Sequence, residues 1–166
     1  MIVIGVDIGF TGGISVIDAC KNKIIEMIPM PVCEKWIDVD KIYNILYNYK
    51  EKYKENIIII IEKQQRNPSS IGQEGAFFAI SKLTIKDVYS VHPTKWQSEM
   101  ALKKDNKYKK EFGYNYICDE YKSFKSKIPS KTKNKYTFHD GCVDAALIAI
   151  WYIQHGYKEN TTEVDD

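Results

Sequence analysis

The sequence predicts an α/β fold with a mixed five-stranded sheet, in which three antiparallel strands are followed by parallel strands and helices flank the sheet. Three observations lead to this prediction. Short apolar runs rich in β-branched residues recur along the chain, and from residue 38 onward they alternate with segments of helical period. Glycines follow the first run closely enough to form a tight hairpin turn. Five consecutive isoleucines at 57–61 are typical of a strand covered on both faces.

The first half of the chain supplies most of the expected sheet. The first apolar run ends at Asp7, and a glycine-rich turn at 9–13 leads into the second strand. Prolines at 29 and 31 close the third strand. We expect strands at 2–7, 14–17 and 23–30, a helix at 38–55 and a further strand at 57–61.

The second half adds a further strand–helix unit and closes with an apolar helix. Pro93 stops the last expected strand, and Gly156 is the expected C-terminal stop of the last helix. In chain order we expect a polar loop at 65–70, a helix at 73–83, a strand at 87–91, a Lys-rich loop at 101–110, a helix at 111–124 interrupted at Gly113, a basic irregular segment at 125–135 and a helix at 139–154.

Length and composition limit the chain to one domain. It has 166 residues, of which 44% are hydrophobic and 28% charged, the balance of an ordinary globular protein. We predict a single domain at 1–157 and an acidic, disordered tail at 158–166. Lysine is abundant, but so are the other residues with AT-rich codons, so lysine richness alone does not indicate a function.

The cysteines and the N-terminus exclude several protein classes. The four cysteines form no CxxC pair, and neither they nor the three histidines have the spacing of a zinc site. We therefore expect reduced thiols, as in an intracellular compartment. The N-terminus has no basic region and reaches an acid at position 7, so it resembles neither a signal peptide nor a membrane span. We predict a soluble, cytoplasmic protein without a membrane partner.

Four acidic residues stand where a carboxylate is costly. Asp7 and Glu62 end apolar strands, while Asp140 and Asp144 open the apolar last helix. Because functional groups of α/β sheets gather at the carboxyl ends of strands, Asp7 and Glu62 are expected at one edge. Asp140 and Asp144 are four residues apart and share one helix face. Leu147 and Trp151 fall on the same face, so we expect it to point toward the sheet, although the helix is apolar nearly all round and this direction is not uniquely fixed.

Each acid except Asp144 also has a simple structural explanation. Asp7 precedes a glycine-rich turn, and Glu62 stands beside a lysine at a strand end. Asp140 could cap the last helix. Asp144 lies within AALIAIW, where no such role is evident. Because these explanations would all have to hold together, we favour a functional cluster.

The donor set of this cluster suits hard metal ions. A site that gathers several carboxylates must bind cations or keep some carboxyls protonated. Oxygen ligands without cysteine or clustered histidine suit Mg²⁺ or Mn²⁺. Four carboxylates can hold two such ions, and two ions about 4 Å apart clamp the attacking and leaving oxygens of a phosphodiester. The pattern therefore predicts a metal-dependent nuclease with two ions in its active site.

Four segments together resemble the RuvC-like Holliday junction resolvases, most of all the compact versions of phages and other DNA viruses. They are IGVDIGFTGGI at 4–14, IIIIE at 58–62, VHPTKWQ at 91–97 and HDGCVDAALIA at 139–149, and the resemblance runs from about residue 2 to residue 155. It implies an RNase H-like fold, a homodimer, and paired nicks in opposing strands of a four-way DNA junction. It also implies that the metal ligands are Asp7, Glu62, Asp140 and Asp144.

The last helix departs from the bacterial members of this family in one respect. They usually space the last two ligands by three residues, a position that Gly141 occupies here. Asp140 and Asp144 are four residues apart and still share a face, so we expect Asp140 to be the ligand. His139 is expected either to carry protons for the reaction or to cap the helix or lie at the surface.

The expected DNA contacts lie in two segments. Bacterial members place an aromatic residue soon after the strand-end glutamate, whereas this chain has KQQRN at 63–67, so polar side chains are expected to contact DNA there. The stretch 95–135 carries twelve lysines and five acids, a net charge of +7, against −5 for the rest of the chain. Its interleaved tyrosines are expected to pack rather than to stack on bases. The candidate contacts are Lys63, Gln65, Arg66, Lys95, Lys103, Lys104, Lys107, Lys109 and Lys110, although a solvated position is the alternative for any single lysine.

Three other functions fit parts of the pattern. A nuclease of the same fold could act on branched or flap DNA more broadly. DIGFT at 7–11 also resembles the first phosphate motif of actin- and sugar-kinase-type ATPases, but that architecture needs a second domain and a second phosphate loop. A catalytically silent nucleic-acid-binding relative is disfavoured because all four acids are present.

Overall fold

A computed structural model of the chain describes residues 1–54, 56–65, 67–104, 107–108, 110–121, 124–129 and 138–156. At 103–104 and 107–108 it describes the backbone alone. The expected acidic tail at 158–166 lies outside these ranges, as does most of the basic segment at 125–135. No described helix is long and apolar enough to cross a membrane.

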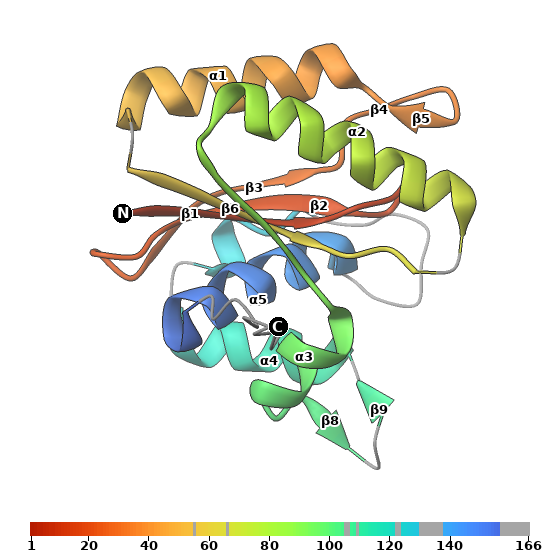
Figure 1. The fold of residues 1–166 in the computed structure, drawn as a ribbon. Helices are drawn as coiled ribbons and strands as arrows, with labels where there is room; N and C mark the ends of the chain where they lie inside the picture. The colour runs from red at the N-terminus through yellow and green to blue at the C-terminus, as the bar shows by residue number, and fades with distance from the viewer. Residues whose placement is uncertain are drawn as a thin grey trace, which may run out of the picture.

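The centre of the fold is a mixed five-stranded sheet with the order β3-β2-β1-β6-β7 (Figure 1). The first three strands are antiparallel neighbours, and β6 and β7 continue the sheet parallel to β1. This confirms the predicted sheet, with strand bounds within two residues of those expected. The strands are β1 (Ile2–Asp7), β2 (Gly13–Asp18), β3 (Lys23–Pro29), β6 (Ile57–Glu62) and β7 (Asp87–Val91).

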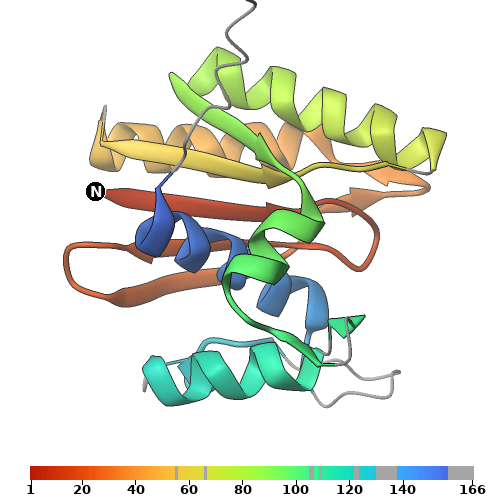
Figure 2. The same ribbon diagram turned by 60° about the horizontal axis from the view of Figure 1, so that its bottom comes forward.

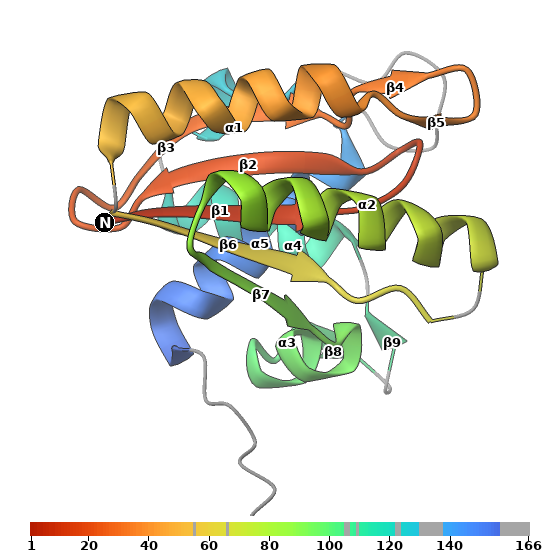
Figure 3. The same cartoon turned by 45° about the horizontal axis from the view of Figure 1, so that its top comes forward.

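Helices cover both faces of this sheet, which makes three layers. Helices α1 (Val39–Tyr53) and α2 (Pro68–Thr84) lie side by side on one face (Figure 3). Helix α5 (Asp140–His155) crosses the other face against β1 and β2, and α4 (Lys110–Glu120) packs behind α5 (Figure 2). Helix α5 is therefore enclosed between the sheet and α4, which explains why it is apolar nearly all round.

The isoleucine strand divides its side chains between two hydrophobic cores. Ile57, Ile59 and Ile61 pack beneath α1 and α2, whereas Ile60 packs in the core that contains α5. This alternation is the two-residue period of a strand. The expectation of a strand covered on both faces is confirmed.

The helix starts follow from capping residues. The side chain of Asp38 accepts a hydrogen bond from the backbone N–H of Lys41 at the start of α1. Helix α2 begins at Pro68, five residues before the expected start, because Asn67 caps it and proline suits the first helical position. The predicted helix at 73–83 is thus confirmed but was too short.

The structure corrects the sequence prediction in four places. A hairpin of β4 (Val32–Cys33) and β5 (Trp36–Ile37) and the short helix α3 (Pro93–Glu99) were not expected. The expected loop at 101–110 contains the antiparallel pair β8 (Lys103–Lys104) and β9 (Lys107–Tyr108). Helix α4 runs through Gly113, which is buried, and ends at Glu120, ahead of a 3₁₀ turn at Phe124–Ser126. Strands of two residues carry too little periodicity to be predicted.

Candidate active site

Two of the four acids end neighbouring parallel strands. Val6 of β1 pairs with Ile61 of β6, so Asp7 and Glu62 follow at the same level of the sheet. Both side chains are partly buried. The expectation that these two acids share the carboxyl edge of the sheet is confirmed.

Helix α5 brings the other two acids to this edge because glycines allow a close approach. A Cβ atom at Gly5 of β1 would lie 2.0 Å from the carbonyl oxygen of Ala145 in α5. Gly141 bridges to the β1–β2 turn, and a Cβ atom there would lie 2.0 Å from a backbone oxygen of that turn. These contacts fix the first turns of α5, where Asp140 is 9% exposed and Asp144 is 7% exposed.

Carboxylates of three elements lie close enough to repel one another. Burial raises the pKa of Asp7 well above its ordinary value, and the charges of Asp144 and Glu62 raise it further. Burial is also the main cause that raises the pKa of Glu62 to about 7. A hydrogen bond from Trp96 lowers this pKa, whereas the charge of Asp144 raises it. A group of acids that disfavours its own ionisation in this way must either keep some carboxyls protonated or have positive charge nearby.

Part of that charge comes from Lys110 at the start of α4. Its Nζ atom lies 2.7 Å from Oδ2 of Asp140 and 3.2 Å from Oδ2 of Asp144. Burial would lower the pKa of Lys110, but Asp144 and Asp140 outweigh burial and raise it. Within the described part of the chain, no group of three or more His, Cys, Asp or Glu side chains is arranged to hold a metal ion. A lysine ammonium bridges the two aspartates of α5 instead.

Two residues of this site were missed in the sequence. Trp96 of α3 is fully buried, and its Nε1 donates a 2.8 Å hydrogen bond to Oε2 of Glu62. Glu74 of α2 accepts a 2.7 Å hydrogen bond from the backbone N–H of Gln64 and raises the pKa of Glu62. Trp96 stands in VHPTKWQ at 91–97, one of the segments of the family resemblance, but nothing there marked it as a partner of Glu62, and Glu74 had no signal.

The N-cap of α5 decides between the structural roles considered for His139 and Asp140. The N-cap is His139, whose Nδ1 accepts a hydrogen bond from the backbone N–H of Cys142. The capping role expected as one alternative for His139 is therefore confirmed. Asp140 is the first residue of the helix and not its cap, so the capping explanation for Asp140 is wrong.

Known structures with a similar fold were found, although neither a scan of protein-family models nor a search of curated proteins gives a match. A structure of Thermus thermophilus RuvC is 17% identical, covers 94% of this chain and 97% of its own, and has a TM-score of 0.59. RuvC from T. thermophilus in complex with a Holliday junction substrate is 14% identical, covers 92% of both chains, and also has a TM-score of 0.59.

The chain has a RuvC-like fold. The RNase H-like α/β architecture implied by the sequence resemblance is thereby confirmed. The Holliday junction resolvase of fowlpox virus is 16% identical, covers 93% of this chain and 99% of its own, and has a TM-score of 0.46.

The predicted DNA contacts of this RuvC-like fold are only partly described. Lys63 and Gln65 are exposed beside the carboxyl edge, on the segment that follows Glu62. Lys95 is partly buried, with Nζ 5.8 Å from the ring centre of Trp151. Arg66 and Lys109, and the side chains of Lys103, Lys104 and Lys107, lie outside the described residues. Lys110 contacts the acids, as described above, and its contact with DNA stays a prediction.

The tyrosines of the basic stretch support the expectation that they pack. The ring of Tyr114 stacks on Phe138 with centroids 4.2 Å apart. Tyr121 is buried, and the hydroxyl of Tyr116 accepts a hydrogen bond from Gln154. The side chains of the other two tyrosines, Tyr108 and Tyr136, lie outside the described part.

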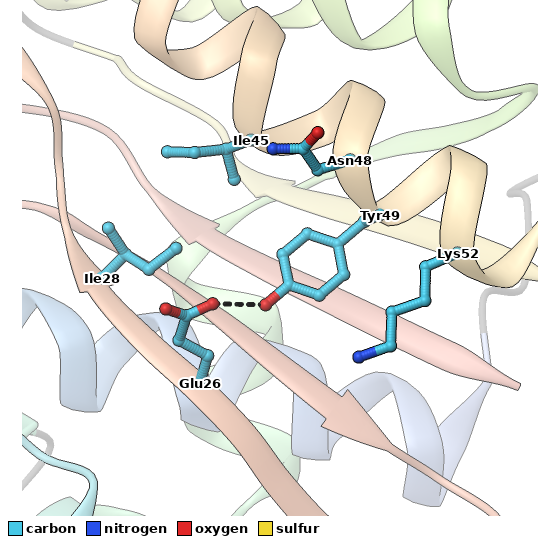
Figure 4. Close-up of a pocket in the computed structure, with 6 residues that line it drawn as sticks. All are labelled: Glu26, Ile28, Ile45, Asn48, Tyr49 and Lys52. Carbon is cyan, nitrogen blue, oxygen red and sulfur yellow. Dashed lines mark hydrogen bonds between the residues drawn. The ribbon is translucent and has the colours of Figure 1, made fainter.

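A separate pocket of about 360 Å³ lies between β3 and α1 (Figure 4). The hydroxyl of Tyr49 donates a hydrogen bond to Glu26 inside it. Its lining residues come from β3 and from α1 above it, whereas Asp140 and Asp144 belong to α5 on the opposite face of the sheet. We therefore place the candidate active site at the carboxylates and not in this pocket.

The raised pKa of Glu62 predicts how the stability of the metal-free protein depends on pH. The pKa of about 7 in the folded chain exceeds the ordinary value of 4.5, so the folded form retains a proton that the unfolded chain has released. The resulting stabilisation is fully present below about pH 4.5 and is lost as the pH rises through about 7. In urea unfolding with EDTA, we expect Glu62→Gln to gain roughly 2–3 kcal/mol relative to the parent chain between pH 4.5 and pH 8. A difference that stays constant across this range would contradict the prediction.

Proposed function

We propose that the chain is a metal-dependent, structure-selective endonuclease that resolves four-way DNA junctions. The observation that carries this proposal is the gathering of acids from β1, β6 and α5 at one edge of the sheet, where burial and mutual repulsion raise the pKa values of Asp7 and Glu62. The RuvC-like fold supports it, because one solved RuvC of this fold holds a Holliday junction substrate. The position of the acids at strand ends, rather than the fold alone, is the basis for expecting chemistry there.

The residues present fit divalent ions by the chemistry of their donors. Asp7, Glu62, Asp140 and Asp144 offer only carboxylate oxygens, the ligands preferred by Mg²⁺ and Mn²⁺. The single ammonium of Lys110 cannot neutralise four carboxylates, and among the described residues its ion pairs are with the two acids of α5. We propose that these four acids hold two ions, which would supply an activated water and stabilise charge on the phosphate.

The remaining residues of the site orient the acidic side chains and offset part of their negative charge. Trp96 fixes the carboxylate of Glu62 through its indole N–H, and being fully buried it also keeps solvent from that side. Lys110 links the start of α4 to both acids of α5, so its ammonium adds positive charge beside two of the proposed metal ligands. Lys63 and Gln65 are exposed next to Glu62, where they can contact the DNA backbone.

We further propose that the active form is a homodimer. A four-way junction presents two equivalent strands that must both be cut, and each chain offers one cluster of acids. A twofold-symmetric pair of chains would place one cluster at each of these strands.

The proposal is tested by cutting assays on matched DNA substrates. The protein is incubated with a synthetic four-way junction, a flap and a plain duplex, in Mg²⁺, Mn²⁺ or EDTA. We expect the junction to be cut only with a divalent ion and the duplex to stay intact. Equal cutting of all three substrates would refute junction resolution in favour of a broader nuclease. No cutting with either ion would refute the nuclease itself.

A supercoiled plasmid that extrudes a cruciform tests the pairing of the nicks. Paired nicks within one binding event convert the plasmid directly to a linear form. Independent single nicks give an open circle first, and accumulation of that form would contradict a dimer that cuts both strands.

A further inference from the structure

The turn between β1 and β2 exposes an aromatic side chain three residues from Asp7. Phe10 is 51% exposed, in the turn that directly follows the strand ending at Asp7. The other exposed large apolar side chains of the described residues lie in β4, β5, α1, α2 and α4. The segment after Glu62, the other strand end of the site, is polar in sequence, with KQQRN at 63–67.

The turn that carries Phe10 is fixed on three sides. The backbone N–H of Gly12 donates a 2.9 Å hydrogen bond to the carbonyl of Gly9, which places Phe10 at the tip of a tight turn. The carbonyl of Gly12 accepts a 3.0 Å hydrogen bond from Met30 beyond β3. Gly12 also bridges to Gly141 at the start of α5. A side chain on this turn therefore has a defined position relative to both Asp7 and α5.

An exposed aromatic side chain on a hydrogen-bonded turn beside the proposed cleavage site suits one kind of contact. Every nucleobase has a flat face, and stacking on an aromatic side chain is favourable for any base sequence. In a continuous duplex these faces are covered by neighbouring base pairs. At a branch point the stack is interrupted, so a base face becomes available to a protein ring.

We propose that Phe10 stacks on a nucleobase at the branch point and so helps to distinguish branched DNA from duplex. This inference rests on the proposed nuclease function and assigns a specificity-determining residue to it. The rigid turn places the stacked base next to the phosphate that Asp7 and its neighbours act on. The ring contributes to the choice of substrate and takes no part in the chemical step.

The test compares variants at position 10 with a matched surface control. Phe10→Ala removes the ring, Phe10→Leu keeps an apolar side chain without a flat face, and Phe10→Trp keeps an aromatic ring. Leu83→Ala removes an apolar side chain that is 84% exposed, near the C-terminal end of α2. Binding to a four-way junction and to a duplex is measured in EDTA, with 2-aminopurine at the branch reporting base stacking by its fluorescence.

We expect Phe10→Ala and Phe10→Leu to weaken junction binding about 5- to 150-fold, the equivalent of about 1–3 kcal/mol, and to leave duplex binding unchanged. Both variants should also lose the 2-aminopurine response, whereas Phe10→Trp and Leu83→Ala should retain the parent values. Because the side chain is exposed, thermal unfolding of all four variants should match the parent closely.

Two results would overturn the inference without touching the nuclease proposal. The first is a Phe10→Ala variant that binds the junction and changes the 2-aminopurine signal as the parent does. The second is equal weakening of junction and duplex binding. If instead the parent chain itself fails to cut any branched DNA in Mg²⁺ or Mn²⁺, the nuclease proposal fails, and this inference fails with it.

Discussion

We expect the Asp144→Asn variant to cut a four-way DNA junction about 10³-fold more slowly than the parent chain, or slower still. Asp144 is 7% exposed, and its charge raises the pKa values of both Asp7 and Glu62, so it lies close to both of these acids. Asparagine has the same shape but removes the negative charge that a divalent ion requires. Loss of one ligand to a catalytic ion removes several kcal/mol of transition-state stabilisation, and each 1.36 kcal/mol is tenfold in rate.

Asp7→Asn provides a second, independent measurement at the same site. At pH 8 in EDTA we expect this variant to be more stable than the parent by about 1–2 kcal/mol, or about 2–8 °C in Tm, because it removes a buried charge among like charges. Adding Mg²⁺ should raise the Tm of the parent but not of the variant, since only the parent binds the ion in its folded form.

The matched control for both variants is Asp18→Asn. Asp18 also ends a strand of the sheet, and its side chain accepts hydrogen bonds from the backbone N–H groups of Cys20 and Lys21. Because β2 runs antiparallel to β1, Asp18 lies at the opposite edge from Asp7. We expect parent-like cutting from this variant. If Asp7→Asn and Asp144→Asn also cut like the parent, the assignment of these acids as metal ligands is wrong.

The second large effect is expected at Gly5, in the middle of β1. Gly5→Ala should lower the free energy of unfolding by about 3 kcal/mol and the Tm by about 6–12 °C. The new Cβ atom would lie 2.0 Å from the carbonyl oxygen of Ala145 and 2.8 Å from the backbone nitrogen of Ala149, so α5 would have to move away from the sheet. Junction cutting should fall as well, because the same helix carries Asp140 and Asp144.

Gly75→Ala is the control for this substitution. Gly75 lies inside α2, and a Cβ atom there would meet nothing within 4 Å. Alanine is favoured over glycine in a helix, so the variant should be more stable than the parent by about 0.5–1 kcal/mol. Urea unfolding of both variants with unchanged m-values gives the comparison. A Gly5→Ala protein as stable as the parent would show that β1 and α5 are not in close contact.

The large elements of the fold could be predicted because their sequence patterns are strong. Five isoleucines in a row left few alternatives to a buried strand, and the apolar segment from His139 onward was long enough to be a helix. The two acids at strand ends were brought together as expected, since adjacent parallel strands end at the same edge. Periodicity and strand order are local or nearly local properties of the sequence, which is why they could be predicted from it.

The side-chain contacts that complete the site could not be predicted from the sequence in the same way. Trp96 reaches Glu62 across 34 positions of sequence, and Lys110 reaches Asp140 across 30. Lys110 was predicted to contact DNA because it stands in a basic stretch, and nothing in that stretch distinguished it from its neighbours. Which lysine faces the acids depends on how α4 packs against α5, and this packing is a tertiary property.

The path of the chain through the sheet has a consequence for biosynthesis. Asp7 is synthesised long before Asp140 and Asp144, because β1 precedes α5 in the chain. Helix α5 packs on β1 and β2, so the hydrophobic core on this face of the sheet can form only after α5 has been synthesised. A growing chain thus holds only Asp7 and Glu62 of the four acids until α5 has been synthesised. The cluster of four acids is therefore assembled only after α5 has been synthesised.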